Sequence, residues 1–215
     1  MDALEAIKTR RSIRRFLEKP VPRDLIFEVV DAGRLAPSAG NLQNWKFIAV
    51  FDEARKKEIA EACMGQYWME KATVHIVIVS EPTIAKRYYG VRGERLYSTQ
   101  NCAAAAENML IAANALGLGA CWVGAFDEDR VKNATSTPPE YRPQVIVVLG
   151  YADEQPKMPS KHPIEIVSWV NKWRGRTEDI DEYFGFYGEK IKAAAKGAKK
   201  LLDKGVKKLT EKIKD

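Results

Sequence analysis

Four short apolar runs alternate with amphipathic segments along most of the chain. The runs are bounded by polar residues or glycine and predict strands at 46–51, 74–79, 119–124 and 144–150. Apolar residues that recur every three or four positions predict helices at 2–10, 24–35, 55–64, 101–116 and 127–134. Helices interleaved with strands in this way indicate an α+β or α/β domain.

The composition is typical of a globular protein. The 215 residues suffice for one domain with a core, and 46% of them are apolar and 30% charged. No apolar run approaches the roughly 20 residues that span a bilayer. The acidic start at 1–5 lacks the features of a signal peptide, and the three cysteines have no CxxC spacing, which is typical of reduced thiols. We therefore expect a cytoplasmic protein.

The net charge of +6 comes from residues 189–215, where ten lysines stand beside four acids. Residues 1–188 are balanced in charge, so the composition changes at residue 188. The tail repeats apolar residues in a pattern that predicts an amphipathic helix. The residues are Ile191, Ala194, Ala198, Leu202, Val206, Leu209 and Ile213. We expect this apolar stripe to pack on the body or on a partner subunit; attachment to a membrane surface or to nucleic acid is the alternative.

Several common catalytic motifs are missing. The chain has no GxGxxG, Walker A or GxSxG motif, which argues against a Rossmann site, a P-loop and a hydrolase nucleophile. His75 lies inside an apolar strand and His162 in a loop, so we expect neither a histidine metal site nor a Ser-His-Asp triad. We interpret His75 as a hydrogen-bonded strand residue. An organic cofactor is therefore expected to carry the chemistry, and no metal site is predicted.

Two polar segments offer the groups that a phosphorylated ring cofactor needs. Residues 10–16 (RRSIRRF) supply guanidinium groups and a hydroxyl for a phosphate. Residues 36–45 (APSAGNLQNW) supply small residues and amides that suit close approach to a flat ring. Together they favour flavin mononucleotide (FMN). Taken singly, the first segment also fits a solvated basic helix end, and the second fits an ordinary turn between a helix and a strand.

The two segments resemble the nitroreductase family of FMN-dependent oxidoreductases. The resemblance continues at 105–113 (AAENMLIAA), 116–124 (LGLGACWVG) and 161–165 (KHPIE). It implies an α+β fold in which helices flank a central mixed β-sheet, and an intertwined homodimer with FMN at the interface. We expect an FMN-binding domain at 1–188, followed by the lysine-rich amphipathic helix at 189–215.

The resemblance also implies how the phosphate is bound. Arg10, Arg11 and Ser12 would bind the FMN phosphate and ribityl chain, and Lys161 would reach the same phosphate. The family often has arginine in place of Lys161; a lysine supplies charge without a bidentate fork. Arg14 would lie near N1 and the C2 carbonyl of the flavin, where a cation stabilises the reduced, anionic form.

Other segments would complete the flavin site. The implied contacts from the second subunit are Pro37, Ser38, Ala39 and Asn41. Val123 and Gly124 would offer backbone groups near N5 and O4, although they also suit an interior strand that ends in a glycine turn. Gln66 would contact the ribityl chain or the ring. The family usually has proline where Asn44 stands and an acid at or near Asn101, so the roles of these two side chains stay open.

The segment 86–98 is rich in tyrosine and arginine. In the family, the equivalent stretch covers the open face of the flavin. Tyr88 and Tyr89 would stack on a nicotinamide or nitroaromatic ring, and Arg92 and Arg95 would meet a phosphate or carboxylate. A charged surface helix is the equal alternative.

The predicted function is that of an FMN-dependent oxidoreductase that acts as a homodimer. NADH or NADPH would pass a hydride to flavin N5, and a nitroaromatic, quinone or flavin acceptor would then enter the same pocket in a ping-pong cycle. No side chain is expected to act as a general acid. The alternatives are reductive dehalogenation or flavin fragmentation on the same fold, a flavin-binding redox sensor, and nucleic-acid or membrane binding through the tail.

Overall fold

A computed structural model describes residues 1–175, 185, 188–189, 192–193 and 196 of the chain. The chain divides into two compact units, Met1–Met158 and Pro159–Asp215. The apolar positions on which the predicted tail helix rests lie outside the described residues, so this helix stays a prediction.

The first unit is built around a four-stranded sheet. Its strands are β1 (Trp45–Val50), β2 (Val74–Ser80), β3 (Gly119–Val123) and β4 (Arg142–Gly150). They lie in the order β1-β2-β4-β3, and all neighbours pair antiparallel. Ser12 adds a single parallel bridge to Ala120 in β3. The predicted α+β fold with a central sheet is therefore confirmed. The resemblance implied a mixed sheet, but the four strands pair antiparallel throughout, and the parallel pairing among the described residues is the isolated Ser12–Ala120 bridge.

Helices and short turns connect the strands. The helices are α1 (Ala3–Thr9), α2 (Arg23–Arg34), α3 (Glu53–Ala62), α4 (Pro82–Arg92), α5 (Ser98–Ala115) and α6 (Glu128–Thr135), with 3₁₀ turns η1 (Ala39–Asn41) and η2 (Tyr67–Lys71) and a π-helical turn η3 (Gly93–Tyr97). The five expected helices and four expected strands are all confirmed, with their ends shifted by no more than three residues.

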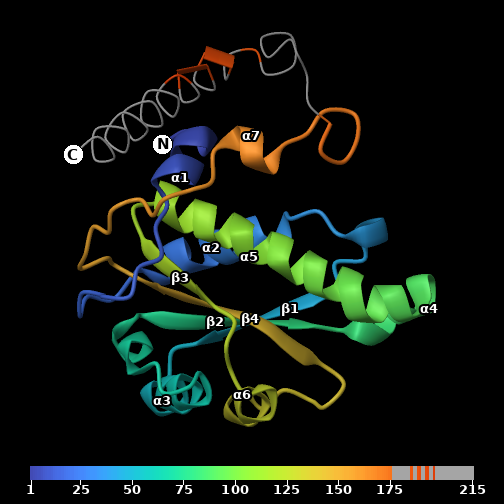
Figure 1. Ribbon diagram of the computed structural model, residues 1–215. Helices are drawn as coiled ribbons and strands as arrows, with labels where there is room; N and C mark the ends of the chain where they lie inside the picture. Colours follow the sequence, from blue (N-terminus) through green and yellow to red (C-terminus); the bar gives the residue numbers. More distant parts are fainter. Residues whose placement is uncertain (176–184, 186–187, 190–191, 194–195, 197–215) are drawn as a thin grey trace, which may run out of the picture. The chain divides into compact units, whose positions relative to one another are not determined.

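Helices cover both faces of the sheet (Figure 1). Buried residues of α2 and α5 form one core cluster with one face, and buried residues of α3 and α6 form a second cluster with the other. In β2, Ile76 and Ile78 belong to the first cluster and Val77 and Val79 to the second. Successive strand residues point to opposite faces, so a strand covered on both faces is apolar at nearly every position.

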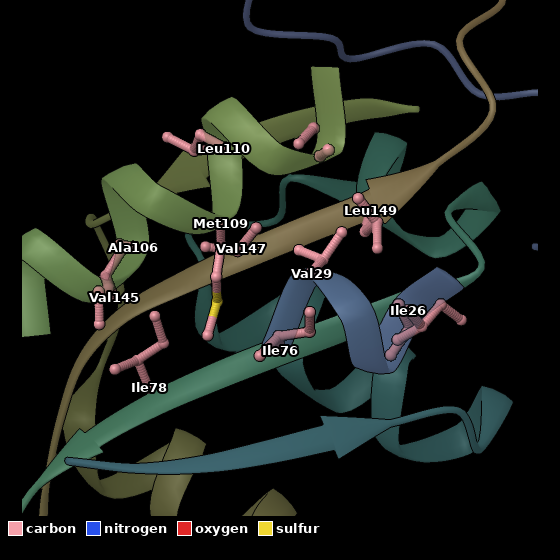
Figure 2. Close-up of a cluster of buried hydrophobic side chains, with 14 of the residues drawn as sticks. Ile26, Val29, Ile76, Ile78, Ala106, Met109, Leu110, Val145, Val147 and Leu149 are labelled. Carbon is pink, nitrogen blue, oxygen red and sulfur yellow. The ribbon is translucent and has the colours of Figure 1, made fainter. Parts of the chain in front are cut away.

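Helices α2 and α5 approach closely at a glycine. A β-carbon on Gly33 would lie only 2.3 Å from Cε of Met109, so a larger residue would push the helices apart. Met109 is fully buried. Figure 2 shows its side chain pointing from α5 toward the sheet, among Val29, Ile76 and Val147.

Polar caps and a glycine set several helix ends. The side chains of Asp2, Asp52 and Asp127 each accept a hydrogen bond from the backbone N–H three residues later, which caps α1, α3 and α6. Helix α5 ends at Ala115, and Gly117 follows with φ of 74°, as the sequence predicts.

The second unit contains the short helix α7 (Ile164–Val167). The apolar segment 164–173 continues as bends, and the rings of Trp169 and Trp173 lie 4.2 Å apart between centroids. Within the part of the chain that the structure describes, no helix is long and apolar enough to cross a membrane.

Candidate functional site

Residues 10–16 follow α1 and lie beside the start of β3. Arg10 is the C-terminal cap of α1. The backbone N–H of Ile13 donates to the carbonyl of Ala120 at 3.0 Å, and Ser12 pairs with the same residue. The predicted phosphate-binding residues therefore lie at the N-terminal end of β3.

Two glutamates hold this segment. The Glu154 carboxylate accepts hydrogen bonds from the backbone N–H groups of Arg14 and Arg15, the latter at 3.0 Å. Glu107 on α5 lies 3.6 Å from Nε of Arg10. Carboxylates at these points fix the backbone and one guanidinium, and they leave Arg11 unpaired with any acid among the described residues.

A cavity of about 350 Å³ opens beside Arg10 and Arg11. Nη1 of Arg11 donates to the carbonyls of Lys8 and Arg10 at 2.9 and 2.7 Å. Its Nε is buried and has no hydrogen-bond partner within the described residues. A buried donor without an acceptor costs free energy, so an oxygen of a bound anion is the expected partner.

The other end of β3 carries Val123 and Gly124. Val123 is buried, and Gly124 is exposed. The Trp122 ring lies beside the glycine, because a β-carbon on Gly124 would be 3.2 Å from Nε1 of Trp122. Ala120 and Val123 lie about 10 Å apart along an extended strand. One strand therefore links the arginine segment to the backbone groups predicted to meet the ring.

Loop 36–44 connects α2 to β1 through an unusual backbone. Gly40, Asn41 and Gln43 have φ angles of 56°, 56° and 47°. Glycine and asparagine adopt this left-handed region more readily than most residues. The hydroxyl of Ser38 accepts a hydrogen bond from the backbone N–H of Gln43 at 3.0 Å, which closes the turn.

Helix α5 anchors this loop. The backbone N–H of Ala39 donates to Oδ1 of Asn101 at 3.0 Å, and Nδ2 of Asn101 donates to Oδ1 of Asn44 at 2.7 Å. The two asparagines whose roles the sequence left open are therefore bonded to each other. Pro37 and Asn41 stay exposed at the rim of the loop.

The segment predicted to bind substrate folds as α4 and η3 and runs directly into α5. A kink divides α4 at Gly90, whose φ of 58° and ψ of −148° favour glycine. The hydroxyl of Tyr89 lies against loop 36–44, since a β-carbon on Gly40 would be 2.3 Å from that oxygen. The predicted substrate segment and the predicted flavin loop are therefore in contact.

The four candidate substrate residues differ in their surroundings. Tyr88 is 65% exposed, and Arg95 is also exposed. Tyr89 meets Tyr97 edge to face, with centroids 5.3 Å apart. Nε of Arg92 donates to the hydroxyl of Tyr97 at 3.1 Å. Tyr97 thus fixes Tyr89 and Arg92, and all four assignments remain predictions.

The candidates contact different turns of α5. Arg10 pairs with Glu107, and Asn114 in the last turn donates to the carbonyl of Ala6 in α1. The loop meets Asn101 in the first turn. A helix rises about 1.5 Å per residue, so Asn101 lies about 9 Å along the axis from Glu107, the partner of Arg10. It lies about 20 Å from Asn114, which lines the cavity beside the arginines. Figure 1 shows α1 and α4 near opposite ends of α5. Within one chain the arginine segment and the loop are therefore separate.

Gln66 and Lys161 lie in other parts of the chain. Gln66 is the N-terminal cap of η2, and Trp68 within η2 stacks on Phe16 with centroids 6.4 Å apart. This contact brings the turn beside the arginine segment. Lys161 is exposed and belongs to the second unit, Pro159–Asp215. The roles of both residues remain predictions.

The three cysteines and His75 of the first unit are buried and neutral near pH 7. Burial raises the pKa of Cys63 and of Cys102 to about 12 and also raises the pKa of Cys121. Burial lowers the pKa of His75 to about 4, and its Nε2 lies 2.9 Å from the carbonyl of Met69. None of these groups is set up as a nucleophile or a base. No cluster of three or more His, Cys, Asp or Glu suited to a metal occurs in the described part of the chain.

Sequence reasoning missed several residues that organise this region. Glu107 and Glu154 carry no recognisable signal, because their arginine partners are distant in sequence. Tyr89 was expected to face a substrate, and its contact with Gly40 was not foreseen. For Asn44 and Asn101 there was a signal, since both positions depart from the residues that the resembled family usually has.

Comparison with known proteins decides the family. The model of the nitroreductase family matches residues 7–68 and 63–151. The chain belongs to the nitroreductase family. This member is 32% identical over 197 residues to an NADH dehydrogenase of Thermus thermophilus, a match that spans 79% of this chain and 96% of the relative.

Two further proteins extend the likeness. An FMN reductase (NADPH) of Bacillus subtilis is 24% identical to this nitroreductase-family chain over 203 residues, covering 88% of the chain and 82% of the relative. The crystal structure of a nitroreductase family protein from Clostridium novyi NT superposes with a TM-score of 0.64 at 28% identity, covering 81% of this chain and 96% of the other.

Proposed function

We propose that this protein is an FMN-dependent NAD(P)H oxidoreductase that acts as a homodimer. Its family and the names of its relatives, NADH dehydrogenase and FMN reductase (NADPH), support NAD(P)H-dependent oxidoreduction. The finer proposal is that hydride passes from NAD(P)H through FMN to an organic acceptor such as a nitroaromatic, a quinone or a flavin.

The observation that carries the proposal is the cavity beside Arg10 and Arg11. Its guanidinium groups, and above all the buried Nε of Arg11 without an acceptor, fit an anionic oxygen. The hydroxyl of Ser12 adds a polar group on the same segment. The residues present therefore fit the phosphate and ribityl chain of FMN.

The remaining residues have roles toward the ring. Bound FMN would supply hydride acceptance and delivery, which no described side chain offers. Backbone groups of Val123 and Gly124 would orient the ring at the C-terminal end of β3. The charge of Arg14 would favour the reduced flavin, and Lys161 would add charge at the phosphate.

The separation of the candidates along α5 supports a dimeric site. The arginine segment and loop 36–44 contact α5 at different turns, so they do not form one cluster within a chain. In a two-fold dimer, the loop of one subunit would meet the flavin held by the arginines of the other. Pro37, Ser38, Ala39 and Asn41 would then contact the ring, and the α4–η3 segment would cover it.

Anaerobic reduction tests this function. The protein is loaded with FMN, unbound flavin is removed, and NADH or NADPH is added while the flavin absorbance is followed. We expect the absorbance to bleach, and an added quinone or nitroaromatic to restore it over repeated cycles. A flavin that does not bleach with either nucleotide contradicts the proposal, and bleaching without turnover of any acceptor favours the sensor alternative.

A further inference from the structure

Three buried polar side chains connect the loop at 36–44 to the α4–η3 segment. Asn44 and Ser98 are fully buried, and Asn101 is 4% exposed. Nδ2 of Asn44 donates to the hydroxyl of Ser98 at 3.0 Å, and Oδ1 of Asn44 accepts from Asn101 at 2.7 Å. We call these three residues the amide relay.

The amide relay ends on backbone groups of three separate segments. Asn101 accepts from the N–H of Ala39 in the loop. Asn44 donates to the carbonyl of Glu81, which caps α4, at 3.1 Å, and Ser98 donates to the carbonyl of Gly93 in η3 at 3.0 Å. One hydrogen-bonded chain therefore fixes the loop to the beginning of α4 and to the beginning of η3.

A second contact joins the same two segments. The hydroxyl of Tyr89 in α4 lies against Gly40, so closely that a β-carbon there would approach it to 2.3 Å. Gly93 is equally constrained, because a β-carbon on it would lie 2.2 Å from the carbonyl oxygen of Ala85. The α4–η3 segment and the loop are therefore in contact at two places, at Tyr89 and Gly40 and through the buried amide relay.

The polar character of the amide relay favours a positioning role. Apolar side chains in this buried space would remove the hydrogen bonds made by the Ala39 N–H and by the carbonyls of Glu81 and Gly93. A polar network is stable only when each member finds its partners. Neither Asn44, Asn101 nor Ser98 has a buried side-chain atom without a partner. A fully paired network of this kind admits one relative placement of the three segments.

We propose that Asn44, Asn101 and Ser98 position the flavin-contacting loop against the segment that covers the substrate. The inference rests on the proposed function. Asn101 acts at the loop, Ser98 at the substrate segment, and Asn44 at both. None of the three touches the reacting atoms in this account; each is a positioning residue.

The test compares single substitutions at the two ends of the amide relay. Asn101→Leu removes the acceptor of the Ala39 N–H, and we expect FMN to bind roughly tenfold more weakly, which is about 1.4 kcal/mol. Ser98→Ala removes the bond to Gly93, and we expect the KM for NADH to rise several-fold while kcat and the FMN dissociation constant change little. FMN binding is measured by fluorescence quenching, which is independent of turnover.

The matched control is Asn108→Leu on the same helix. Asn108 donates to the carbonyl of Ala32 at 3.0 Å and has no bond to the amide relay. It reports how far a lost helix–helix hydrogen bond alone changes FMN binding and the KM. If Asn101→Leu does not fold, Asn101→Ser replaces it, because a hydroxyl retains an acceptor and predicts a smaller loss.

The outcomes separate this inference from the proposed function. Effects split between FMN affinity and KM as described, and absent from Asn108→Leu, support positioning by the amide relay. Equal effects in all three variants, or none in Asn101→Leu and Ser98→Ala, overturn it while the parent still binds and reduces FMN. A parent that binds no FMN overturns the proposed function itself.

Discussion

The two ends of helix α5 differ in the polar chemistry that they present. Beside the later turns, Arg10 and Arg11 line a cavity, Glu107 and Glu154 hold the segment, and the Arg11 Nε is buried without a partner. Beside the first turn, Asn101 belongs to a neutral network with all its partners present. We propose that the incomplete charged site binds a ligand and that the complete neutral network positions neighbouring segments.

This difference assigns separate tasks to residues that the family resemblance groups together. An anion bound beside Arg10 and Arg11 would lower the free energy of this region, because the buried Nε of Arg11 would then have an acceptor. The amide relay makes no direct contact with a ligand in this account. It fixes loop 36–44 and α4 in place, so its substitutions affect binding through geometry.

The largest expected effect is the loss of FMN affinity when the arginines beside the cavity are replaced. Replacing Arg10 and Arg11 together by glutamine removes both charges beside the cavity and keeps hydrogen-bonding capacity. Hydrogen bonds to charged groups contribute about 1.5–3 kcal/mol each, so FMN affinity is expected to fall more than a hundredfold, or by at least about 3 kcal/mol.

The control for this pair is Arg15→Gln. Arg15 lies on the same segment but pairs with Asp153, where its Nη2 is 3.5 Å from a carboxylate oxygen. Titration with FMN, followed by fluorescence, should leave this variant within about twofold of the parent. Equal losses in both variants would mean that the general positive charge of the segment, not the cavity, binds the flavin.

The next expected effect is a loss of folding stability at acidic pH, caused by His75. It limits binding comparisons between variants to neutral pH. Burial lowers the pKa of His75 from 6.5 to about 4, so the unfolded state binds a proton that the folded state rejects. Stability is then present above pH 6.5 and is lost as the pH falls toward 4, by about 3 kcal/mol in total. Urea unfolding at several pH values should show this loss in the parent.

A paired substitution identifies the group responsible. His75→Leu should lack this part of the pH dependence, even though it is less stable at neutral pH. His162→Leu, at an exposed position, should keep it. If the loss below pH 6.5 is the same in His75→Leu as in the parent, carboxyl groups cause it instead.

A smaller effect separates redox tuning from binding within the arginine segment. Arg14 is exposed and its backbone is held by Glu154. Arg14→Ala should leave much of the FMN bound but slow its reduction by NAD(P)H about tenfold, because a close charge stabilises mainly the reduced flavin. Stopped-flow reduction at saturating FMN measures this rate. An unchanged rate would remove Arg14 from the proposed set.

The smallest effect concerns the lysine-rich tail. Truncation after Gly188 removes ten lysines and none of the proposed flavin contacts. FMN content and NAD(P)H oxidation should stay close to those of the full chain. A lower thermal unfolding temperature after truncation would indicate that the tail packs on the body or on a partner subunit. Loss of binding to anionic vesicles would instead indicate that the tail attaches to membrane surfaces. A folded, truncated protein that holds no FMN would assign the tail to the flavin site.

Most of the fold follows from local pattern. The run 74–79 is apolar at nearly every position because helices cover both faces of β2, and Gly117 ends α5 because its backbone is left-handed. The pattern did not predict α4 as a distinct element. Its kink at Gly90 and the π-helical turn at Gly93–Tyr97 interrupt the helical spacing of apolar residues.

The candidate site was less accessible to sequence reasoning. Arginines and a hydroxyl at 10–16 predict an anion site by composition alone. The partners that define the site come from remote positions: Glu154 is 140 residues from Arg14, and Asn101 is 57 residues from Asn44. Neither pairing has a local signature, because tertiary packing and not sequence spacing brings the groups together.

The central claim is that FMN is held by the arginine segment of one subunit and loop 36–44 of the other. Mixed dimers test it directly. Subunits with Arg10→Gln and Arg11→Gln are combined with subunits carrying Ala39→Trp, which blocks the loop. We first confirm that each variant alone is folded, dimeric and free of FMN.

Bound flavin in the mixed dimer is then counted by its absorbance after heat release. If the site is shared between subunits, one of the two sites contains both defects and the other contains neither, so the mixed dimer should bind a single FMN. If both segments serve the same subunit, each site retains one defect. A mixed dimer without FMN, under conditions in which parent subunits exchange and bind it, would contradict the shared site.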